Sequence, residues 1–283
     1  MIAVTGSTGH LGRLVIDQLL EKLPAGQLIA LARNLDKAKD FAERGVQIRK
    51  ADYDVPSSLL SALAGVDKLL LISSSELGKR DTQHLAILAA ARESKVKYLV
   101  YTSLYHADRL TMSLAPQHVA TEKAIIASNI PYTILRNNWY LENQTENLGS
   151  ALQHGAIMGA AKNGRISAAS RRDYAAAAVA VLTTAGHNSK IYELAGDSSY
   201  TLSELATEVS RQSGKTVAYS DMPADAYAAQ LQNFGLPKPV AEMLASADEC
   251  IARGELSSLS NDLHRLIGWA TTPLGEAIAV ALS

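Results

Sequence analysis

Three glycines near the start of the chain are spaced for binding a phosphate group. A short apolar run precedes them, and an apolar pattern with helical spacing begins at Leu11. The turn between the two, a GxxGxxG pattern, reads Gly6-Ser7-Thr8-Gly9-His10-Leu11-Gly12. In such a turn the first glycine permits a tight bend, the second lets the main chain approach a diphosphate, and the third lets the helix lie close to the strand. Free N–H groups and the helix dipole favour a phosphate here, so the spacing predicts a dinucleotide site.

The residue after the second apolar run indicates which dinucleotide this turn would take. In NAD-binding folds an acidic residue near the end of the second strand accepts the 2′-hydroxyl of the ribose. Here Arg33 stands 21 residues after Gly12, and no carboxylate occupies positions 31–35. A guanidinium matches a 2′-phosphate in charge and geometry, and Lys37 could add positive charge. We therefore expect NADP(H), although an ordinary solvated arginine after a strand would give the same sequence.

Two further loops could border the cofactor. Asp52 and Tyr53 follow the third apolar run, where Asp52 could accept a hydrogen bond from the adenine amino group and Tyr53 could pack nearby; the alternative is an ordinary turn. The fourth run ends in Ser73, Ser74 and Ser75. This is the carboxyl edge of the expected sheet, where ligands bind. These serines either contact the ribose or diphosphate, or form a loop that is merely rich in serine.

Apolar runs that alternate with helical patterns predict the scaffold for these residues. Strands are expected at 2–5, 28–31, 46–48, 68–72, 98–101, 132–135 and 190–194, and helices at 11–23, 82–93 and 116–128. Continuous apolar strands joined by helices are typical of a parallel sheet that is buried on both faces. The predicted fold is α/β: a doubly wound parallel Rossmann sheet with a smaller, mainly helical C-terminal lobe.

The second half of the chain predicts the lobe. Short helical patterns dominate there, and the sequence Thr201-Leu202-Ser203-Glu204 predicts a capping box that opens a helix to about residue 213. We expect an NADP-binding core over residues 1–142 and a substrate lobe over residues 143–283. The lobe is interleaved with late elements of the core, so that the two form one structural unit.

Charge and cysteine content limit the partners and the compartment. The formal net charge is −1 and there is one cysteine, Cys250. Neither a nucleic-acid nor a membrane partner is expected, and a single thiol fits a reducing compartment, so we expect a cytoplasmic protein. A monomer or homodimer is also expected. No histidine and carboxylate pair has metal-ligand spacing, so no metal is expected.

Six collinear segments carry a resemblance to a known superfamily. They are residues 2–12, 68–75, 101–104, 131–137, 171–178 and 192–197. Together they resemble the short-chain dehydrogenase/reductases, in particular the atypical NmrA-like branch with its bacterial type 2 NADPH:quinone oxidoreductases and triphenylmethane reductases. The resemblance implies that Arg171 comes near the cofactor and that four residues border the nicotinamide: Asn137, Asn138, Trp139 and Tyr140. Relatives often have Gly or Ala in place of Asn138, so the pocket is expected to differ there.

Typical members of the superfamily protonate a carbonyl oxygen with a Tyr-x-x-x-Lys pair and a serine. Here Ser103 is present, but His118 and Glu122 occupy the positions of the tyrosine and the lysine. Residues four apart on a helix face the same way, so this pair is either a His–carboxylate proton relay or a surface pair without a catalytic role; we favour the latter. Asn137, Tyr140 and His118 are the candidate catalytic residues.

The missing acid has a chemical interpretation. The resemblance implies NADPH-dependent transfer of hydride to a quinone or a similar conjugated aromatic acceptor. Such an acceptor yields a stabilised phenolate that can take its proton from water, and a cationic dye needs only hydride. Catalysis then comes mainly from placing the acceptor against the nicotinamide. The alternatives are a reductase of triphenylmethane-type dyes and an NADP(H)-sensing regulatory protein without turnover.

Overall fold

The computed structural model describes residues 1–74, 76, 78–146 and 148–283. These fold into two compact units that alternate along the chain. Unit 1 consists of Met1–Leu104, Gln117–Asn137 and Arg171–Glu193, and unit 2 of Tyr105–Pro116, Asn138–Ser170 and Leu194–Ser283. The sequence analysis divides the chain between residues 142 and 143. In the structure, residues 105–116 and 138–142 belong to unit 2, and residues 171–193 belong to unit 1.

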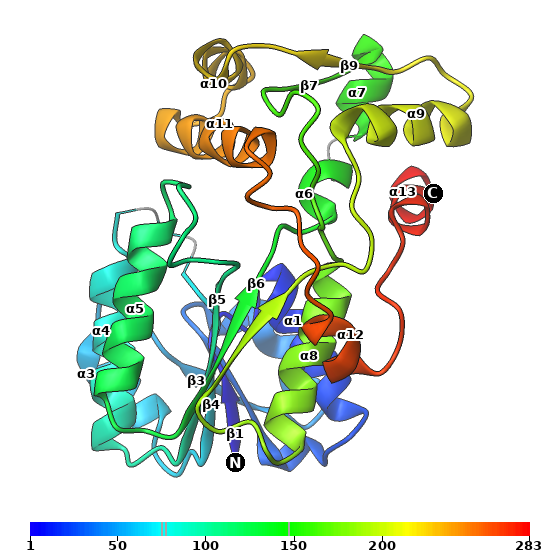
Figure 1. Cartoon of the computed structure of the whole chain (residues 1–283). Coiled ribbons are helices and arrows are strands. Elements are labelled where there is room, and N and C mark those ends of the chain that lie inside the picture. Colours follow the sequence, from blue (N-terminus) through cyan, green and yellow to red (C-terminus); the bar gives the residue numbers. More distant parts are fainter. Residues whose placement is uncertain (75, 77, 147) are drawn as a thin grey trace. The chain divides into compact units, whose positions relative to one another are not determined.

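Unit 1 is built on a seven-stranded sheet (Figure 1). Its strands are β1 (Ile2–Val4), β2 (Leu28–Ala32), β3 (Gln47–Lys50), β4 (Lys68–Leu71), β5 (Tyr98–Leu104), β6 (Tyr132–Asn137) and β8 (Lys190–Leu194). Their order is β3-β2-β1-β4-β5-β6-β8, so the chain winds outwards from β1 in both directions. The neighbouring pairs from β3 to β6 are parallel. The predicted doubly wound Rossmann sheet is therefore confirmed.

Helices cover both faces of this sheet. One face carries α1 (His10–Leu20) and α8 (Arg171–Thr183), which pack on each other; the other carries α3 (Pro56–Ala62), α4 (Arg80–Glu93) and α5 (Ala115–Ala127) (Figure 1). The connections on either side of β2 contain η1 (Ala25–Gln27), η2 (Leu35–Ala38) and α2 (Lys39–Glu43). Because apolar side chains point to both faces, the inner strands are buried on both; Ile29, Leu69 and Leu99, for example, have no exposed surface.

Two helix boundaries differ from the sequence prediction by two or more residues. The first helix was expected to run to residue 23 but ends at Leu20. Its stop has a local cause, because Pro24 disfavours the helical conformation of the preceding residue, Leu23. The helix expected to begin at Thr82 begins two residues earlier, at Arg80. This early start brings the side chain of Arg80 to the loop that follows β4.

Unit 2 is mainly helical, as predicted for the lobe. Its helices are α6 (Glu142–Thr145), α7 (Leu148–His154), α9 (Leu202–Ser213), α10 (Ala224–Asn233), α11 (Lys238–Ala252), α12 (Asp262–Ile267) and α13 (Leu274–Leu282). The capping box at the start of α9 is confirmed, with Thr201 and Glu204 each bonding the main chain of the other. The sequence did not predict the parallel pair formed by β7 (Ala156–Gly159) and β9 (Ala218–Asp221). Within the part of the chain that is described, no helix has the length and apolar character needed to cross a bilayer.

Candidate functional site

The glycine turn joins β1 to α1 at the carboxyl edge of the sheet in unit 1. Gly6 has a φ of 56°, a left-handed conformation in which other residues are strained. The N–H of Gly9 donates to the carbonyl of Gly6 at 2.9 Å. A Cβ atom on Gly12 would lie 2.2 Å from the Gly6 oxygen, so α1 is held directly against the turn. The tight bend at Gly6 and the close packing at Gly12 are therefore confirmed.

The remaining residues of the turn divide into anchored and exposed groups. Ser7 is buried, and its hydroxyl donates to the carbonyl of Leu31 in β2 at 2.9 Å. Gly6, Gly9 and His10 are exposed. Gly9 is the N-cap of α1 and provides no side-chain cap for its first turn. Ser7 therefore fixes the turn, while the first turn of α1, which has no side-chain cap, can take an anion.

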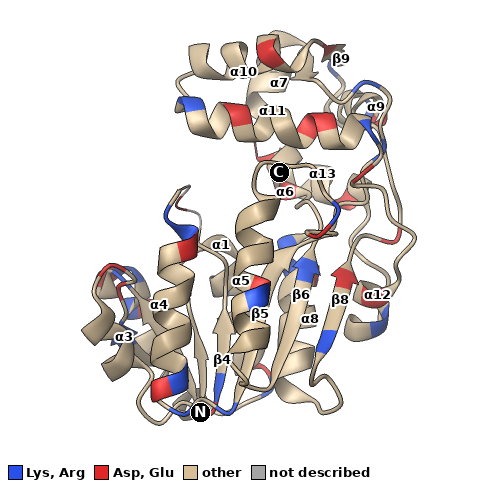
Figure 2. Ribbon diagram, turned by 60° about the vertical axis from the view of Figure 1, so that its left-hand side comes forward, with Lys and Arg blue, Asp and Glu red and all other residues tan. Residues whose placement is uncertain are grey.

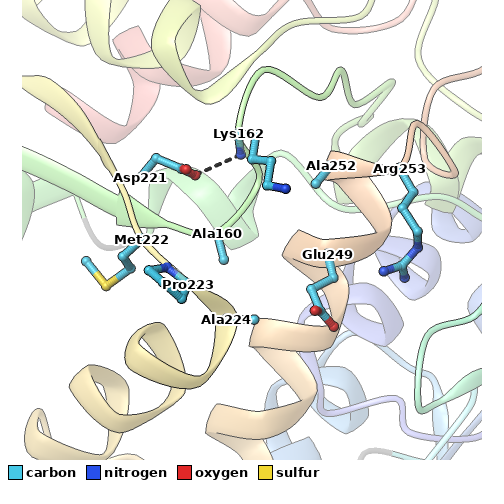
Figure 3. Close-up of a pocket in the computed structure, with 9 residues that line it drawn as sticks. All are labelled: Ala160, Lys162, Asp221, Met222, Pro223, Ala224, Glu249, Ala252 and Arg253. Carbon is cyan, nitrogen blue, oxygen red and sulfur yellow. Dashed lines mark hydrogen bonds between the residues drawn. The ribbon is translucent and has the colours of Figure 1, made fainter.

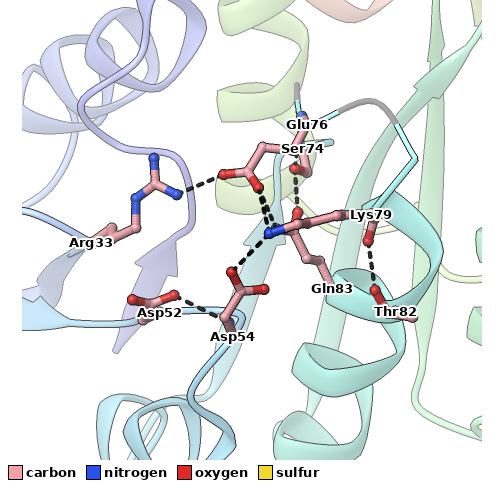
Figure 4. A network of polar contacts seen from close by, with 8 residues as sticks. All are labelled: Arg33, Asp52, Asp54, Ser74, Glu76, Lys79, Thr82 and Gln83. Atoms are coloured by element: carbon pink, nitrogen blue, oxygen red, sulfur yellow. Dashed lines mark hydrogen bonds and ion pairs between the residues drawn. The ribbon is translucent and has the colours of Figure 1, made fainter.

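Arg33 directly follows β2 and takes part in a network of charged groups (Figure 4). Its Nη1 atom donates to Oε1 of Glu76 at 2.6 Å. Nζ of Lys79 lies 3.3 Å from Asp54 and 3.8 Å from Glu76. The carboxylate of Asp52 accepts the N–H of Asp54 at 3.1 Å and thereby closes a local turn. The sequence analysis identified Arg33 as a candidate site residue but did not predict its partner, Glu76.

Tyr53 faces the interior of unit 1. Its ring packs against the hydrophobic core beneath β1 to β5, and burial raises the pKa of its hydroxyl to about 12. The hydroxyl therefore stays protonated at physiological pH. Any adenine contact by Tyr53, like the acceptor role expected of Asp52, stays a prediction.

The loop after β4 is fixed by side chains of α4. The N–H of Ser74 donates to Nε2 of His84 at 3.0 Å, its carbonyl accepts from Nε of Arg80 at 2.9 Å, and its hydroxyl donates to Gln83 at 2.5 Å. The N–H of Ser73 donates to the hydroxyl of Thr102 at 2.9 Å. These serines therefore hold the loop in place, and Ser75 lies outside the described residues.

Beneath this loop, polar side chains of α4, β5 and α5 form a buried layer. Arg80 is 5% exposed and donates to Gln117 at 2.9 Å, and His84 bonds Thr121 at 2.9 Å. Burial, reinforced by the charge of Arg80, lowers the pKa of His84 to about 3. An arginine without a carboxylate partner among the described residues thus sits beside a neutral histidine, in a layer that the sequence analysis did not predict.

His118 and Glu122 are both buried, so the favoured interpretation as a surface pair was wrong. They are 4% and 5% exposed, and they face different partners. Nδ1 of His118 bonds the hydroxyl of Tyr101 at 2.8 Å. Burial lowers the pKa of His118 well below its ordinary value, with the charge of Arg80 adding to the effect. His118 is therefore neutral at physiological pH, and its catalytic role stays a prediction.

Glu122 belongs to a buried ion-pair cluster that spans α5, β6 and β8. Its carboxylate accepts two hydrogen bonds from Arg136, at 2.9 and 2.7 Å, and one from the hydroxyl of Ser103 at 2.6 Å. Arg136 also pairs with Glu193 at 2.8 Å, where a basic stretch of β6 lies beside an acidic one of β8 (Figure 2). The positions expected to hold the lysine and serine of a catalytic acid are thus bonded to each other in a structural cluster.

Asn137 ends β6 at the same edge of the sheet. Its side chain is 4% exposed, and its Oδ1 atom is buried and accepts no hydrogen bond from any described residue. A buried oxygen that accepts no hydrogen bond lowers the stability of the folded protein by about 1–3 kcal/mol. It is therefore suited to accept a hydrogen bond from an amide or hydroxyl group of a ligand.

Of the other residues expected near the cofactor, Asn138, Trp139 and Tyr140 belong to unit 2, whereas Arg171 belongs to unit 1 with Asn137. Asn138 belongs to unit 2, where its Nδ2 donates to the carbonyl of Leu256 at 3.0 Å and its Oδ1 accepts the N–H of Trp139 at 2.7 Å. Trp139 is buried, and the main chain of Tyr140 pairs with that of Ala169 in an isolated parallel β-bridge. Arg171 begins α8 in unit 1. Since both polar atoms of the Asn138 side chain bond the main chain, this residue acts first as a structural residue of unit 2.

Unit 2 contains a pocket of about 510 Å³ that the sequence did not predict (Figure 3). It is lined by Ala160, Lys162, Asp221, Met222, Pro223, Ala224, Glu249, Ala252 and Arg253. Asp221 accepts the main-chain N–H of Lys162 at 2.8 Å. Asp248, beside the lining residue Glu249, is buried and accepts the N–H of Ala160 at 2.8 Å. Burial raises the pKa of Asp248 to about 7, and the charge of Asp221 adds to the effect.

Comparison with known proteins agrees with this geometry. A family model described as NAD(P)H-binding matches residues 6–185. The chain belongs to this NAD(P)H-binding family. The matched residues include the glycine turn, Arg33 and Asn137.

Relatives of this family cover the whole chain. Quinone oxidoreductase 2 of Escherichia coli is 48% identical over 99% of this chain and 98% of its own length. The structure of an NADPH-dependent quinone oxidoreductase from Escherichia coli complexed with NADPH has a TM-score of 0.97 and covers both chains fully at 48% identity. Triphenylmethane reductase from Citrobacter sp., complexed with NADP(H), has a TM-score of 0.95 at 42% identity, over 99% of this chain and 100% of its own. The resemblance stated from the sequence is confirmed.

Proposed function

We propose that this protein is an NADPH-dependent oxidoreductase that transfers hydride to quinones or similar conjugated electrophiles. One observation carries the proposal: the glycine turn leads into α1, whose first turn has no side-chain cap, and Arg33 follows the neighbouring strand. A diphosphate and a 2′-phosphate are the anions that this combination recognises. The relatives that cover the full chain include quinone and dye reductases.

The residues at the edge of the sheet fit such a cofactor. The main chain from Gly6 to Gly12 would hold the diphosphate, with Ser7, Thr8, His10 and Leu11 contributing through their backbone. Arg33 would hold the 2′-phosphate, and the loops at Asp52 and Ser73 would border the adenosine. The unpartnered oxygen of Asn137 would accept a hydrogen bond from the carboxamide of the nicotinamide. NADPH bound there would supply the hydride.

The arrangement at α5 favours acceptors that need no acid from the protein. Glu122 and Ser103 are bonded to each other, and His118 is neutral and buried. A simple ketone needs a proton as its oxygen becomes an alkoxide, whereas the phenolate formed from a quinone is stabilised and can be protonated by water. The chain's contribution is therefore to orient the acceptor and to exclude competing reactions.

Reduction of triphenylmethane dyes is a second candidate, because the likeness to the Citrobacter reductase is nearly as high as that to the quinone oxidoreductase. A cationic dye also needs only hydride. The two activities share one cofactor site and differ in the acceptor. A panel that contains both acceptor classes therefore ranks them directly.

The test is NADPH oxidation, followed at 340 nm, with small quinones, aldehydes and cationic dyes, and repeated with NADH. Turnover with quinones supports the proposal, and turnover with dyes alone supports the second candidate. Binding of NADPH without turnover of any acceptor would contradict both and favour an NADP(H) sensor. Arg33→Gln should lower kcat/KM for NADPH more than that for NADH. The matched control is Arg44→Gln, an exposed arginine that pairs with Asp17 on α1.

We further propose that the protein acts in the cytoplasm as a monomer or homodimer. Its single cysteine, Cys250, is buried and is typical of a protein from a reducing compartment. Light scattering of the purified full chain measures the oligomeric state, and a larger assembly would contradict this part of the proposal.

A further inference from the structure

The guanidinium that the proposed function assigns to the 2′-phosphate already has a carboxylate partner. Nη1 of Arg33 lies 2.6 Å from Oε1 of Glu76, a residue of the loop after β4 (Figure 4). The side chain of Arg33 is 67% exposed and that of Glu76 is 34% exposed, so both can be reached from solvent. A 2′-phosphate that binds Arg33 must compete with this carboxylate.

The surroundings of the pair are acidic on balance. Asp52 and Asp54, like Glu76, act on Arg33 and raise its pKa, with the hydrogen bond to Glu76 the largest cause. Lys79 contributes a second cation, paired with Asp54 and Glu76. Three carboxylates thus face two cations, which leaves a formal charge of −1 at the place where a phosphate of charge about −2 would bind. Compared with Arg33 alone, the network therefore favours the neutral 2′-hydroxyl of NADH over the charged 2′-phosphate of NADPH.

Glu76 is also held from the side opposite Arg33. Its second oxygen, Oε2, accepts from Nε2 of Gln83 at 3.0 Å, and its own N–H donates to the hydroxyl of Ser74 at 3.2 Å. Gln83 in turn accepts from that same hydroxyl. Because these bonds do not involve Arg33, the carboxylate stays next to the 2′ position when the guanidinium turns to another anion.

We propose that Glu76 sets the coenzyme selectivity of this chain, which is an inference that rests on the proposed function. Glu76 competes with the 2′-phosphate of NADPH for Arg33, and it offers a carboxylate acceptor to the 2′-hydroxyl of NADH. In NAD-binding folds such an acceptor comes from the end of the second strand. Here it comes from the loop after the fourth strand, so NADH is accepted and the preference for NADPH is smaller than Arg33 alone would produce.

The test uses Glu76→Gln in the purified full chain, because glutamine keeps the size of the side chain and removes its charge. Dissociation constants for NADPH and NADH are measured by fluorescence titration, with adenosine 2′,5′-bisphosphate and 5′-AMP as probes of the adenosine end alone. Since the groups are exposed, NADPH should bind about threefold more tightly and NADH about threefold more weakly. The selectivity for NADPH over NADH should therefore rise about tenfold. Salt should reduce the gain for NADPH.

Two controls isolate the contact from a general change of charge. Glu21→Gln makes the same charge change at the other end of α1, about 16 Å along the helix axis, and should leave the selectivity unchanged. In an Arg33→Gln background, Glu76→Gln should tighten NADPH binding less than it does in the wild type, because only the repulsion between the carboxylate and the phosphate is then removed. Equal selectivity of Glu76→Gln and the wild type, with both folded by circular dichroism, would overturn the inference. Glu76→Ala repeats the comparison should the glutamine variant fail to fold.

The same titrations separate this inference from the proposed function. If the wild type binds neither NADPH nor NADH, the proposed function fails and this inference fails with it. If the wild type binds NADPH and turns over an acceptor, but removal of the charge of Glu76 leaves the ratio of the two dissociation constants unchanged, this inference alone is refuted.

Discussion

Arg136 on β6 and Glu122 on α5 form a two-pronged ion pair inside unit 1, with hydrogen bonds of 2.9 Å from Nε and 2.7 Å from Nη2. Both side chains are less than a tenth exposed. Breaking a buried pair by removing one partner leaves the other charge unpaired, which usually destabilises a protein by about 3–5 kcal/mol. The pair therefore explains why a charged residue can stand at each of these buried positions.

We predict that Glu122→Gln lowers the free energy of unfolding by about 3 kcal/mol, measured by urea denaturation. The proposed function gives Glu122 no contact with the cofactor or the acceptor. We therefore expect kcat/KM to change by less than about threefold at a temperature where the variant is folded. Glu21→Gln, an exposed glutamate on α1, is the control and should have little effect on either quantity. A large loss of turnover with unchanged stability would instead make Glu122 catalytic.

The buried histidines predict a loss of stability in acid. The folded-state pKa of His84 is about 3, against an ordinary value of 6.5, and that of His118 is also strongly lowered. Below pH 6.5 the unfolded chain therefore binds more protons than the folded chain. Stability should fall as the pH drops from 6.5 towards 3, by about 1.4 kcal/mol per pH unit from His84, with His118 acting in the same direction.

Replacing His84 by Gln should flatten this dependence while lowering stability at neutral pH, because the bonds to Ser74 and Thr121 change. Urea denaturation at pH 7, 6, 5 and 4 measures the slope. His154→Gln, at the exposed end of α7, should leave the slope of the wild type intact. If the wild type and His84→Gln have parallel curves, His84 is not buried as a neutral group.

The glycine turn offers a matched pair of substitutions. A Cβ at position 12 would lie 2.2 Å from a main-chain oxygen, whereas one at position 9 would meet the same oxygen at 3.3 Å. Gly12→Ala should therefore lower the free energy of unfolding by about 3 kcal/mol or more. Gly9→Ala should fold with a smaller loss, yet weaken NADPH binding about tenfold, because its methyl group occupies the approach to the main chain.

Fluorescence titration and thermal unfolding separate the two effects. Gly149→Ala, where a Cβ would meet nothing within 4 Å, controls for the change from glycine to alanine. An unchanged affinity in Gly9→Ala would place the diphosphate elsewhere and contradict the cofactor site proposed here.

The sheet of unit 1 could be predicted from the sequence because its inner strands are continuous apolar runs that pack on both faces. The turn at Gly6 could be predicted because each glycine has a local steric reason. β7 and β9 were missed, since they are four residues each and only Gly159 in them is buried among the residues described. A short strand that is half exposed has no apolar run to mark it.

The partners of the charged residues could not be predicted, because they come from distant parts of the chain. Glu76 lies 43 residues from Arg33 along the chain, whereas the acidic residue of NAD-binding folds is expected near the end of the second strand. Arg136 and Glu122 belong to different elements, and only the packing of α5 on the sheet brings them together. For Asp248 there was a signal: it is an acidic residue on the buried face of α11 that also contains Ala241 and Ala245.

Asp248 predicts a pH dependence opposite to that of the histidines. Its folded-state pKa is about 7, against an ordinary value of 3.8, because the carboxylate is buried and Asp221 adds like charge. The folded chain therefore holds a proton between pH 4 and 7 that the unfolded chain releases. The stabilisation is complete below pH 3.8 and is lost as the pH rises through 7, to a total of about 4 kcal/mol at most.

Asp248→Asn should therefore be more stable than the wild type at pH 8 and close to it at pH 4, since an amide oxygen can still accept the N–H of Ala160. The difference between the two unfolding free energies, rather than either curve alone, is the quantity to compare, because the histidines contribute equally to both chains and cancel. Asp225→Asn, an exposed acid in the first turn of α10, is the control. A difference that is constant from pH 4 to pH 8 would mean that Asp248 is ionised throughout this range and that burial does not raise its pKa.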